Sequence, residues 1–455
     1  MVGERTHKGL TRRLGLFAVI SIIVADMVGT GIFTTSGLLM ENLNNPVLMV
    51  ALWGVGGIIA LSGAFCYAEL STAMPYAGGE YLYISKLFHP IPGFLSGWIS
   101  FIVGFSAPVA ATSIAVSEYT IEAFPAIKNF SDINGISGVI IFQKSLAIVV
   151  ILFFAIIHMR GVVFGTKVHN GFTLLKIFLV VGLIIVGFSF GDGDISNFKT
   201  IANSEADSGG FKVVGLSVMW IMFAYSGWNA ASYIGSEVKN PNINLPRSLL
   251  AGTLIVIILY ILLNILFVYA LPPGEMKGVV SVGGRAASKL LGSSFGKAFS
   301  LLVAIGLLST ISSLIILGPR IYYAMAKEGH FFPFAAKVHS KTGTPHWSIV
   351  IQVVVAIIIV LSGTFDDILT YMGFSLGIFP IIAVLGIFKL RKQKLKNYKV
   401  PLYPVLPAFF ILVNLLILIL GFTERPGASS IALLTVLAGI PLYYVFKKTV
   451  RRKGE

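Results

Sequence analysis

Charged residues and cysteine are both scarce in this sequence, and each shortage narrows what the chain can be. Only 12% of the 455 residues are charged, whereas 56% are hydrophobic. The single cysteine, Cys66, cannot form an intrachain disulfide, and no group of cysteine and histidine has the spacing of a metal site. We therefore expect no metal ion and no cofactor. The lack of a nucleophile–base constellation argues against an enzyme.

Long apolar runs fill the sequence instead. Many of them approach the ~20 residues that cross a ~30 Å hydrocarbon layer. They predict an all-α membrane protein, a single transmembrane domain over residues 1–455 with about twelve spanning helices. The spans are expected near residues 14–41, 46–73, 91–122, 143–159, 168–189, 212–237, 248–271, 298–325, 347–362, 367–388, 404–422 and 429–447.

Basic residues outnumber acidic ones by 34 to 19, which gives a formal net charge of +15. With twelve spans, most of the basic residues fall in segments on the same side of the membrane as the N-terminus. These segments include RKQKLKNYK after the tenth span and KKTVRRK at the end. By the positive-inside rule both termini are expected in the cytoplasm, with the protein in a plasma or inner membrane. No basic segment is interleaved with base-stacking aromatic residues, so we expect contacts with anionic lipid and none with nucleic acid.

Two of the predicted spans contain interruptions. The first span reads ADMVGTGIF at Ala25–Phe33, and the sixth reads YSG at Tyr225–Gly227. Each is the first helix of a set of five, because the spans divide into repeat one (about 14–189), repeat two (about 212–388) and two additional helices (about 404–447). Paired interruptions in corresponding helices of inverted halves indicate a transporter binding site.

Both interruptions are expected near the middle of the bilayer. Gly29 lies about 22 Å of helix past Leu14, and Ser226 lies about 17 Å before Glu237. Backbone groups freed there cost several kcal/mol each if they face lipid, so we expect them to line a cavity. The alternative is that these glycines only allow close helix packing, which is common in membranes.

A helix that is broken at this depth offers opposite partial charges to one ligand. Free amides of Thr30, Gly31 and Ile32 suit a carboxylate, and carbonyls at the ends of the preceding segments suit an ammonium. An α-amino acid carries both groups. Those carbonyls lie near Met27, Val28, Phe223 and Ala224. The candidate substrate-binding residues are Val28, Gly29, Thr30, Gly31, Ile32, Phe223, Ala224, Tyr225, Ser226 and Gly227.

Five motifs together resemble the amino acid-polyamine-organocation (APC) superfamily, and most closely its L-type amino acid transporter branch. They are GTGIF (Gly29–Phe33), VHNGFTLLKI (Val168–Ile177), FAYSGWNAASY (Phe223–Tyr233) followed by SEVKNPNINLPRSL, GPRIYYAMAKEGHFF (Gly318–Phe332) and VPLYPVLP (Val400–Pro407). The resemblance covers nearly the whole chain. It implies the leucine-transporter (LeuT-type) fold, with two inverted five-helix repeats and discontinuous helices 1 and 6. It also implies alternating access and exchange or uptake of α-amino acids without sodium.

The resemblance further implies roles for residues beside the second interruption. In that branch the aromatic residue before the break in span six gates the substrate, which assigns the gate to Phe223. Trp228 and Asn229 then line or brace the same region. A structural core role remains the alternative for these residues.

Lys176 is a charged residue deep inside a predicted span. It lies about 12 Å past Val168, beyond the reach of a snorkelling side chain, so it is expected to point inward. Related sodium-independent members have a lysine here whose ammonium replaces a sodium ion, between carbonyls of span one and hydroxyls of span eight. The available hydroxyls are Ser309, Thr310, Ser312 and Ser313, and the candidate coupling residues are Lys176, Asp26, Ser312 and Ser313.

Asp26 departs from the resemblance, because the position before GTGIF is usually uncharged or apolar. An anion at the C-terminal end of a half-helix is disfavoured by the helix dipole, so Asp26 needs a partner or a proton. It either pairs with Lys176 and couples transport to protons, or it faces a wet cytoplasmic vestibule.

The remaining features bear on substrate and partners. Glu80 and Glu118 are expected to be structural, so Asp26 is the carboxylate expected near the breaks and a neutral substrate is favoured over a cationic one. The glycine-rich edges of the site and Phe223 suggest an apolar substrate side chain. Animal members of the branch carry a cysteine between spans three and four that bonds to a heavy chain. The loop at residues 125–143 has none, so we expect no disulfide-linked heavy chain. An ion channel and an amino acid-sensing transceptor are the alternative functions on the same fold.

Overall fold

The computed structural model describes residues 10–131, 137–199, 210–279, 281–362, 365–393 and 398–451. Within these ranges the chain is helical, with two isolated β-bridges and no strand. Ten described helical segments are long and apolar enough to cross a membrane, and two shorter apolar helices lie at 210–224 and 346–361. The predicted all-α architecture with about twelve spans is therefore confirmed.

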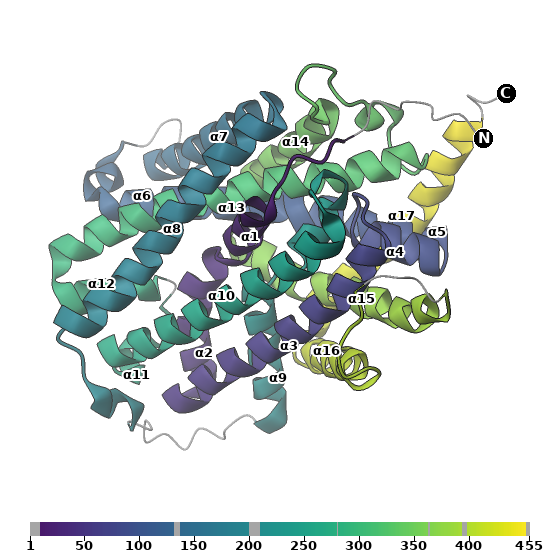
Figure 1. Cartoon of the computed structure of the whole chain (residues 1–455). Coiled ribbons are helices and arrows are strands. Elements are labelled where there is room, and N and C mark those ends of the chain that lie inside the picture. Colours follow the sequence, from purple (N-terminus) through teal and green to yellow (C-terminus); the bar gives the residue numbers. More distant parts are fainter. Residues whose placement is uncertain are drawn as a thin grey trace.

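The helices form one bundle (Figure 1). In chain order they are α1 (Leu16–Met27), α2 (Thr30–Leu43), α3 (Pro46–Ala73), α4 (Glu80–Leu87), α5 (Pro90–Ile99), α6 (Ala107–Ala123), α7 (Gly138–Met159), α8 (Val162–Phe190), α9 (Gly210–Ala224), α10 (Pro241–Ala270), α11 (Pro273–Met276), α12 (Val282–Leu291), α13 (Ser293–Lys327), α14 (His346–Ser362), α15 (Phe365–Leu390), α16 (Val405–Glu424) and α17 (Pro426–Arg451).

Burial separates an inner group of helices from an outer one. In the most apolar stretch of α13, 78% of the residues are buried, whereas in α7 and in α16 only 28% are. Figure 1 shows α1 and α2 inside the bundle, α3 and α10 running side by side, and α16 and α7 on opposite sides. The outer helices present apolar side chains outward, as lipid-facing helices do.

The first span is broken where the sequence predicts it. Helix α1 ends at Met27 and α2 begins at Thr30, with Gly29 in an extended conformation between them. The α13 residue Thr310 and the α9 residue Ala224 pack against this gap. The break therefore lies among inner helices and away from the outer surface.

The sixth span is also broken, but its second half differs from the prediction. The sequence predicts helix as far as residue 237, whereas the α-helix α9 ends at Ala224 and only short 3₁₀ turns follow, at Ala230–Tyr233 and Gly235–Glu237. Gly227 adopts φ +99°, a conformation that residues with side chains rarely adopt. Tertiary contacts then hold the segment, because Ile234 pairs with Ala77 through a β-bridge.

A buried ion pair fixes the end of this segment. The Arg320 guanidinium on α13 donates to Glu237 at 2.7 and 3.1 Å, and both side chains are almost fully buried. The carbonyl of Glu237 also accepts the N–H groups of Arg13 and Leu14. The start of span one, the end of span six and α13 are thus joined at one place.

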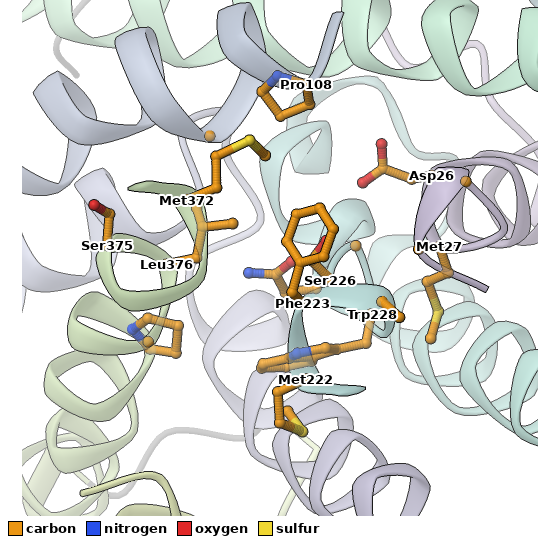
Figure 2. Close-up of a pocket in the computed structure, with 18 of the residues that line it drawn as sticks. Asp26, Met27, Pro108, Met222, Phe223, Ser226, Trp228, Met372, Ser375 and Leu376 are labelled. Carbon is orange, nitrogen blue, oxygen red and sulfur yellow. The ribbon is translucent and has the colours of Figure 1, made fainter. Parts of the chain in front are cut away.

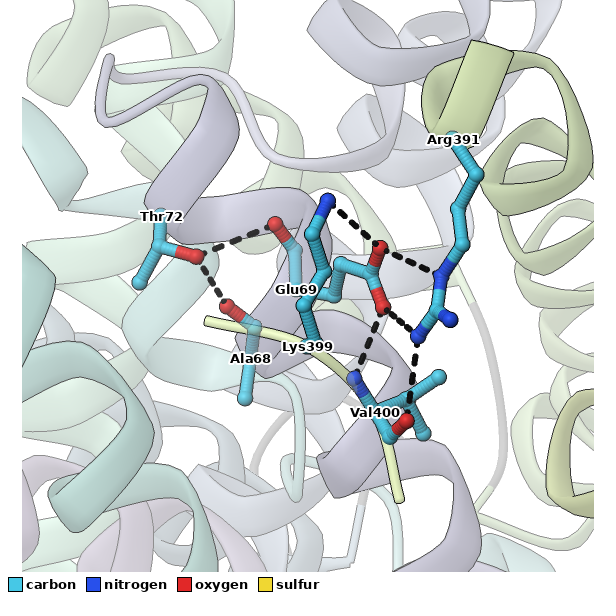
Figure 3. Close-up of polar contacts among 6 residues, drawn as sticks. All are labelled: Ala68, Glu69, Thr72, Arg391, Lys399 and Val400. Carbon is cyan, nitrogen blue, oxygen red and sulfur yellow. Dashed lines mark hydrogen bonds and ion pairs between the residues drawn. The ribbon is translucent and has the colours of Figure 1, made fainter. Parts of the chain in front are cut away.

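A second polar cluster ties α3 to the segment before α16 (Figure 3). The fully buried Glu69 carboxylate accepts hydrogen bonds from Arg391 at 2.9 and 2.8 Å and from the N–H of Val400 at 2.7 Å. Lys399 adds an ion pair at 3.6 Å. This buried charge is fully partnered, which is the condition for a carboxylate to be kept in the interior. The basic segment after the tenth span thus has a structural role besides topology.

Candidate functional site

A cavity lies where the two broken spans meet (Figure 2). Its volume is about 150 Å³, and a single water needs roughly 10–15 Å³ by this measure. The cavity therefore has room for a small organic solute. Most of the predicted binding residues line it. They are Gly29, Thr30, Gly31, Phe223, Ala224, Ser226 and Gly227.

Three predicted binding residues lie outside the cavity lining. The side chains of Val28 and Ile32 are buried in the core. Tyr225 points toward α3, where its hydroxyl donates to the carbonyl of Trp53 at 3.0 Å and its ring packs against Tyr260. These side chains pack in the core beside the breaks and do not face the cavity.

The amide end of the first break is open. Helix α2 begins at Thr30, and no side chain of the described residues caps its first N–H groups. The first turn of an α-helix has no internal acceptors for these N–H groups, and the dipole adds positive potential there. A Cβ atom on Gly31 would lie 2.7 Å from Cα of Ala224, so the glycine lets the two broken spans touch.

The carbonyl end of the first break is occupied by side chains. The Lys176 ammonium donates to the carbonyl of Ala25 at 3.1 Å, to the carbonyl of Val28, and to Oγ1 of Thr310 at 2.7 Å. The Thr310 hydroxyl in turn donates to the same carbonyls of α1. Lys176 is thus buried among oxygen atoms from α1 and α13, as the sequence leads us to expect.

The hydroxyl beside Lys176 differs from the two selected from the sequence. Thr310 makes this contact, whereas Ser313 donates to the carbonyl of Ile22 at 3.2 Å. Ser312 faces two buried histidines, with its Oγ 2.8 Å from Nε2 of His158 and 3.2 Å from Nδ1 of His169. Each step along a helix turns the side chain by about 100°, so these neighbours point to different partners.

Asp26 lines the cavity and makes no ion pair with Lys176. Its Oδ1 atom is buried and receives no hydrogen bond from any described residue. Its Oδ2 atom faces the second break, because a Cβ atom on Gly227 would lie 2.6 Å from it. Figure 2 shows the carboxyl directed into the space beside Phe223.

Of the aromatic residues at the second break, Phe223 stands in the cavity and Trp228 packs against the residues around it. Phe223 is partly buried, and its ring stands in the middle of the cavity (Figure 2). The Trp228 ring is largely buried in edge-to-face contact with Tyr67 and Phe410, at centroid distances of 4.8 and 5.6 Å. The geometry suits a mobile ring at Phe223 and a fixed one at Trp228.

Glu80 also lines the cavity, which the sequence does not indicate. Its Oε1 accepts hydrogen bonds from the Tyr67 hydroxyl and from Nδ2 of Asn229, both at 2.7 Å. Asn229 also donates to the hydroxyl of Tyr233 at 3.1 Å. Burial raises the pKa of the Glu80 carboxyl from 4.5 to about 7, although the hydrogen bonds from Tyr67, Asn229 and Tyr233 oppose this shift.

The third span contributes through an irregular stretch. Residues Ser100–Ser106 form a π-helix, and Ser100, Gly104 and Phe105 line the cavity. Pro108 has no N–H to donate to the carbonyl four residues earlier, which favours the wider winding. Such π-helical stretches are frequent at functional sites, and this wall is not among the predictions made from the sequence.

Comparison with known proteins identifies the family. Residues 14–446 match the amino acid permease family. The chain belongs to this family. The permease is 29% identical over 449 residues to the mouse b(0,+)-type amino acid transporter 1, covering 97% of this chain and 89% of that protein.

Two further relatives match over similar lengths. The serine/threonine exchanger SteT of Bacillus subtilis is 28% identical over 450 residues, covering 97% of the permease and 98% of the exchanger. The human cystine/glutamate transporter is 27% identical over 441 residues, covering 96% and 85%. These matches confirm the predicted APC superfamily, its L-type branch and the LeuT-type fold.

Proposed function

We propose that the permease is a sodium-independent secondary transporter of α-amino acids that works by alternating access. One observation carries the proposal: two broken spans meet at a cavity that the open amide end of α2 lines, and a protein ammonium binds the carbonyl end of the first break. The open amides of Thr30 and Gly31 would receive the substrate carboxylate. The names of the relatives describe amino acid transporters and an exchanger, which supports the same class of substrate.

Lys176 supports independence from sodium. Its ammonium occupies a position surrounded by oxygen atoms of α1 and α13, where a monovalent cation would otherwise be coordinated. A tethered cation cannot dissociate during the cycle. Lys176 would then hold the first break to α13 in one access state, and the chain would need no sodium gradient.

Although the carboxyls of Asp26 and Glu80 also line the cavity, its mainly apolar walls favour a neutral substrate. The side chains that face the predicted substrate position from the third span, α9 and α15 are mainly apolar, and they include Phe105, Met222, Met372 and Leu376. Phe223 stands between these walls and the break, where a gate over the bound substrate would lie. We assign the gate to this ring.

The repeats, the orientation in the membrane and the partners are assigned as follows from a transporter of this fold. Repeat one would cover residues about 14–189 and repeat two about 212–388, with two additional helices at about 404–447. Both termini, whose ends lie outside the described residues, would face the cytoplasm from a plasma or inner membrane. The permease would act without catalysis and without a disulfide-linked heavy chain, and anionic lipid would contact its basic segments.

The test is uptake by purified permease in proteoliposomes. Twenty radiolabelled amino acids are compared with and without internal substrate, and with and without a pH gradient. Saturable uptake of a neutral amino acid supports the proposal, and its dependence on internal substrate separates exchange from net uptake. Ionic conductance without saturable amino acid flux would instead assign the protein to the channel class.

A further inference from the structure

Two of the carbonyl groups freed at the first break, those of Met27 and Val28, are already saturated. The carbonyl of Met27 accepts from the N–H of Gly29 at 2.8 Å and from the Tyr260 hydroxyl at 2.5 Å. The carbonyl of Val28 accepts from both Lys176 and Thr310. A carbonyl oxygen has two lone pairs, so neither group has one left for a substrate ammonium.

The second break has only part of its acceptor capacity left. The carbonyl of Phe223 accepts from the N–H of Ser226 at 2.9 Å, and that of Ala224 lies 3.0 Å from the Tyr260 hydroxyl, whose one proton it shares with the nearer carbonyl of Met27. Each therefore keeps at least one lone pair. These two neutral acceptors leave a bound ammonium without a counter-charge in a site that is shielded from water.

Asp26 supplies that charge at the right place. It belongs to the last turn of α1, three residues before Gly29, and it lines the same cavity as the open amides of α2. Its carboxyl abuts Gly227 of the second break and keeps a buried oxygen without a donor. A donor that enters the cavity between the two breaks comes within reach of this carboxyl group.

We propose that the carboxylate of Asp26 binds the α-ammonium of the substrate, while the amides of Thr30 and Gly31 bind its carboxylate. This assignment rests on the proposed function and names the ammonium ligand within that site. Asp26 thus serves as a substrate ligand and takes over the role that the sequence assigns to the carbonyls of Met27 and Val28.

The charges of the assembled site balance. Lys176 is a cation near Asp26, and it binds the carbonyl of Ala25, the residue before Asp26, without an ion pair to the carboxyl. An amino acid zwitterion adds one positive and one negative charge, each beside its complement. Paired charges of this kind are the ones that a low-dielectric site tolerates. A substrate without the α-ammonium would leave Asp26 facing the cavity unpaired.

The test measures binding by purified permease in detergent, with three pairs of probes that differ only in the α-substituent. They are L-alanine and L-lactate, L-leucine and L-2-hydroxyisocaproate, and L-phenylalanine and L-3-phenyllactate. The variants are Asp26→Asn, Asp26→Glu, and Glu275→Gln as the control. Glu275 forms an exposed ion pair with Lys289 away from the cavity.

For the amino acid that the wild-type protein binds most tightly, Asp26→Asn should weaken binding by about tenfold or more. Its hydroxy acid should be affected far less, so the preference for ammonium over hydroxyl collapses. Asp26→Glu should keep part of that preference, and Glu275→Gln should keep all of it. Thermal stability measured on the same samples shows that each variant is folded.

Two results overturn the assignment while the proposed function stands. One is Asp26→Asn binding the amino acid within about twofold of wild type. The other is equal weakening for the amino acid and its hydroxy acid, which identifies a structural role for Asp26. If wild-type permease binds none of the twenty common amino acids, the proposed function fails and takes the assignment with it.

Discussion

The ammonium of Lys176 on α8 lies 2.7 Å from the hydroxyl oxygen of Thr310 on α13, and both groups bind carbonyls at the end of α1. Three helices, α1, α8 and α13, are therefore joined at one buried point beside the first break. Because the link consists of hydrogen bonds to freed backbone carbonyls, it exists only while that end of α1 stays broken in this way. A change of access state that moves α1 against α13 must alter these bonds.

Lys176→Ala should cut amino acid flux by about tenfold or more, because the carbonyls of Ala25 and Val28 lose their cation. Apparent affinity should also fall, since the first break is no longer held in order. The measurement is initial uptake into proteoliposomes at several substrate concentrations. Lys144→Ala is the matched control, because Lys144 donates to the carbonyl of Leu361 at an exposed position. Flux near wild type in Lys176→Ala would remove Lys176 from the mechanism.

Phe223→Ala should still bind substrate but transport it slowly or let it leak, because the backbone contacts persist while the ring over the cavity is lost. Equilibrium binding and uptake rate are measured on the same preparation. Phe211→Ala serves as the control, since Phe211 is an exposed residue near the start of the same helix. An unchanged uptake rate in Phe223→Ala would make this ring a structural one.

Gly31→Ala should lower both the melting temperature and transport, because its Cβ would press on the backbone of Ala224 at 2.7 Å. Gly29→Ala should be better tolerated in stability, since its nearest neighbour, Cγ2 of Thr310, would lie at 3.5 Å. Gly171→Ala is the control, because nothing lies within 4 Å of its Cβ position. Equal melting temperatures for Gly31→Ala and Gly171→Ala would contradict the close contact of the two breaks.

Glu80→Gln should flatten the pH dependence of stability. The pKa of the folded-state carboxyl is raised from 4.5 to about 7, so the folded protein holds a proton that the unfolded chain releases. Folding stability should therefore fall as pH rises from about 4.5 to about 7, by up to ~3 kcal/mol, and stay lowered above pH 7. Glutamine is neutral and isosteric, so it should stabilise the protein relative to wild type at pH 8.

Melting temperatures at pH 5 and pH 8 check this prediction. Glu328→Gln is the control, because Glu328 forms an exposed ion pair with Lys86 at 3.6 Å. A parallel pH profile for Glu80→Gln and wild type would show that the Glu80 carboxyl does not titrate in this range.

The sequence predicts those parts of the site whose signals are local. A Gly-Thr-Gly stretch or a lysine inside an apolar run is anomalous wherever it occurs, so the breaks and the buried Lys176 could be predicted. The hydroxyl beside Lys176 could not, because four hydroxyls within five residues differ only in helix rotation. The structure selects Thr310 among them.

Contacts between distant segments account for what the sequence does not indicate. Glu80 reaches the cavity only because the loop before α4 folds against Ile234 and Tyr233 of the second break. The contribution of α16, through Phe410 and Asn414, likewise depends on packing between helices far apart in the chain. Neither Glu80 nor the two α16 residues carry a periodic or compositional signal in the sequence that would predict their place in the cavity.

The most direct test of the account is the sodium dependence of wild-type uptake. Initial rates of uptake of the best substrate are measured in proteoliposomes with sodium and with choline in its place, at equal ionic strength. We predict saturable uptake with the same rate and the same apparent affinity in both, because the Lys176 ammonium already lies where the cation would bind. Uptake that rises with sodium, or the absence of any saturable amino acid uptake, would contradict it.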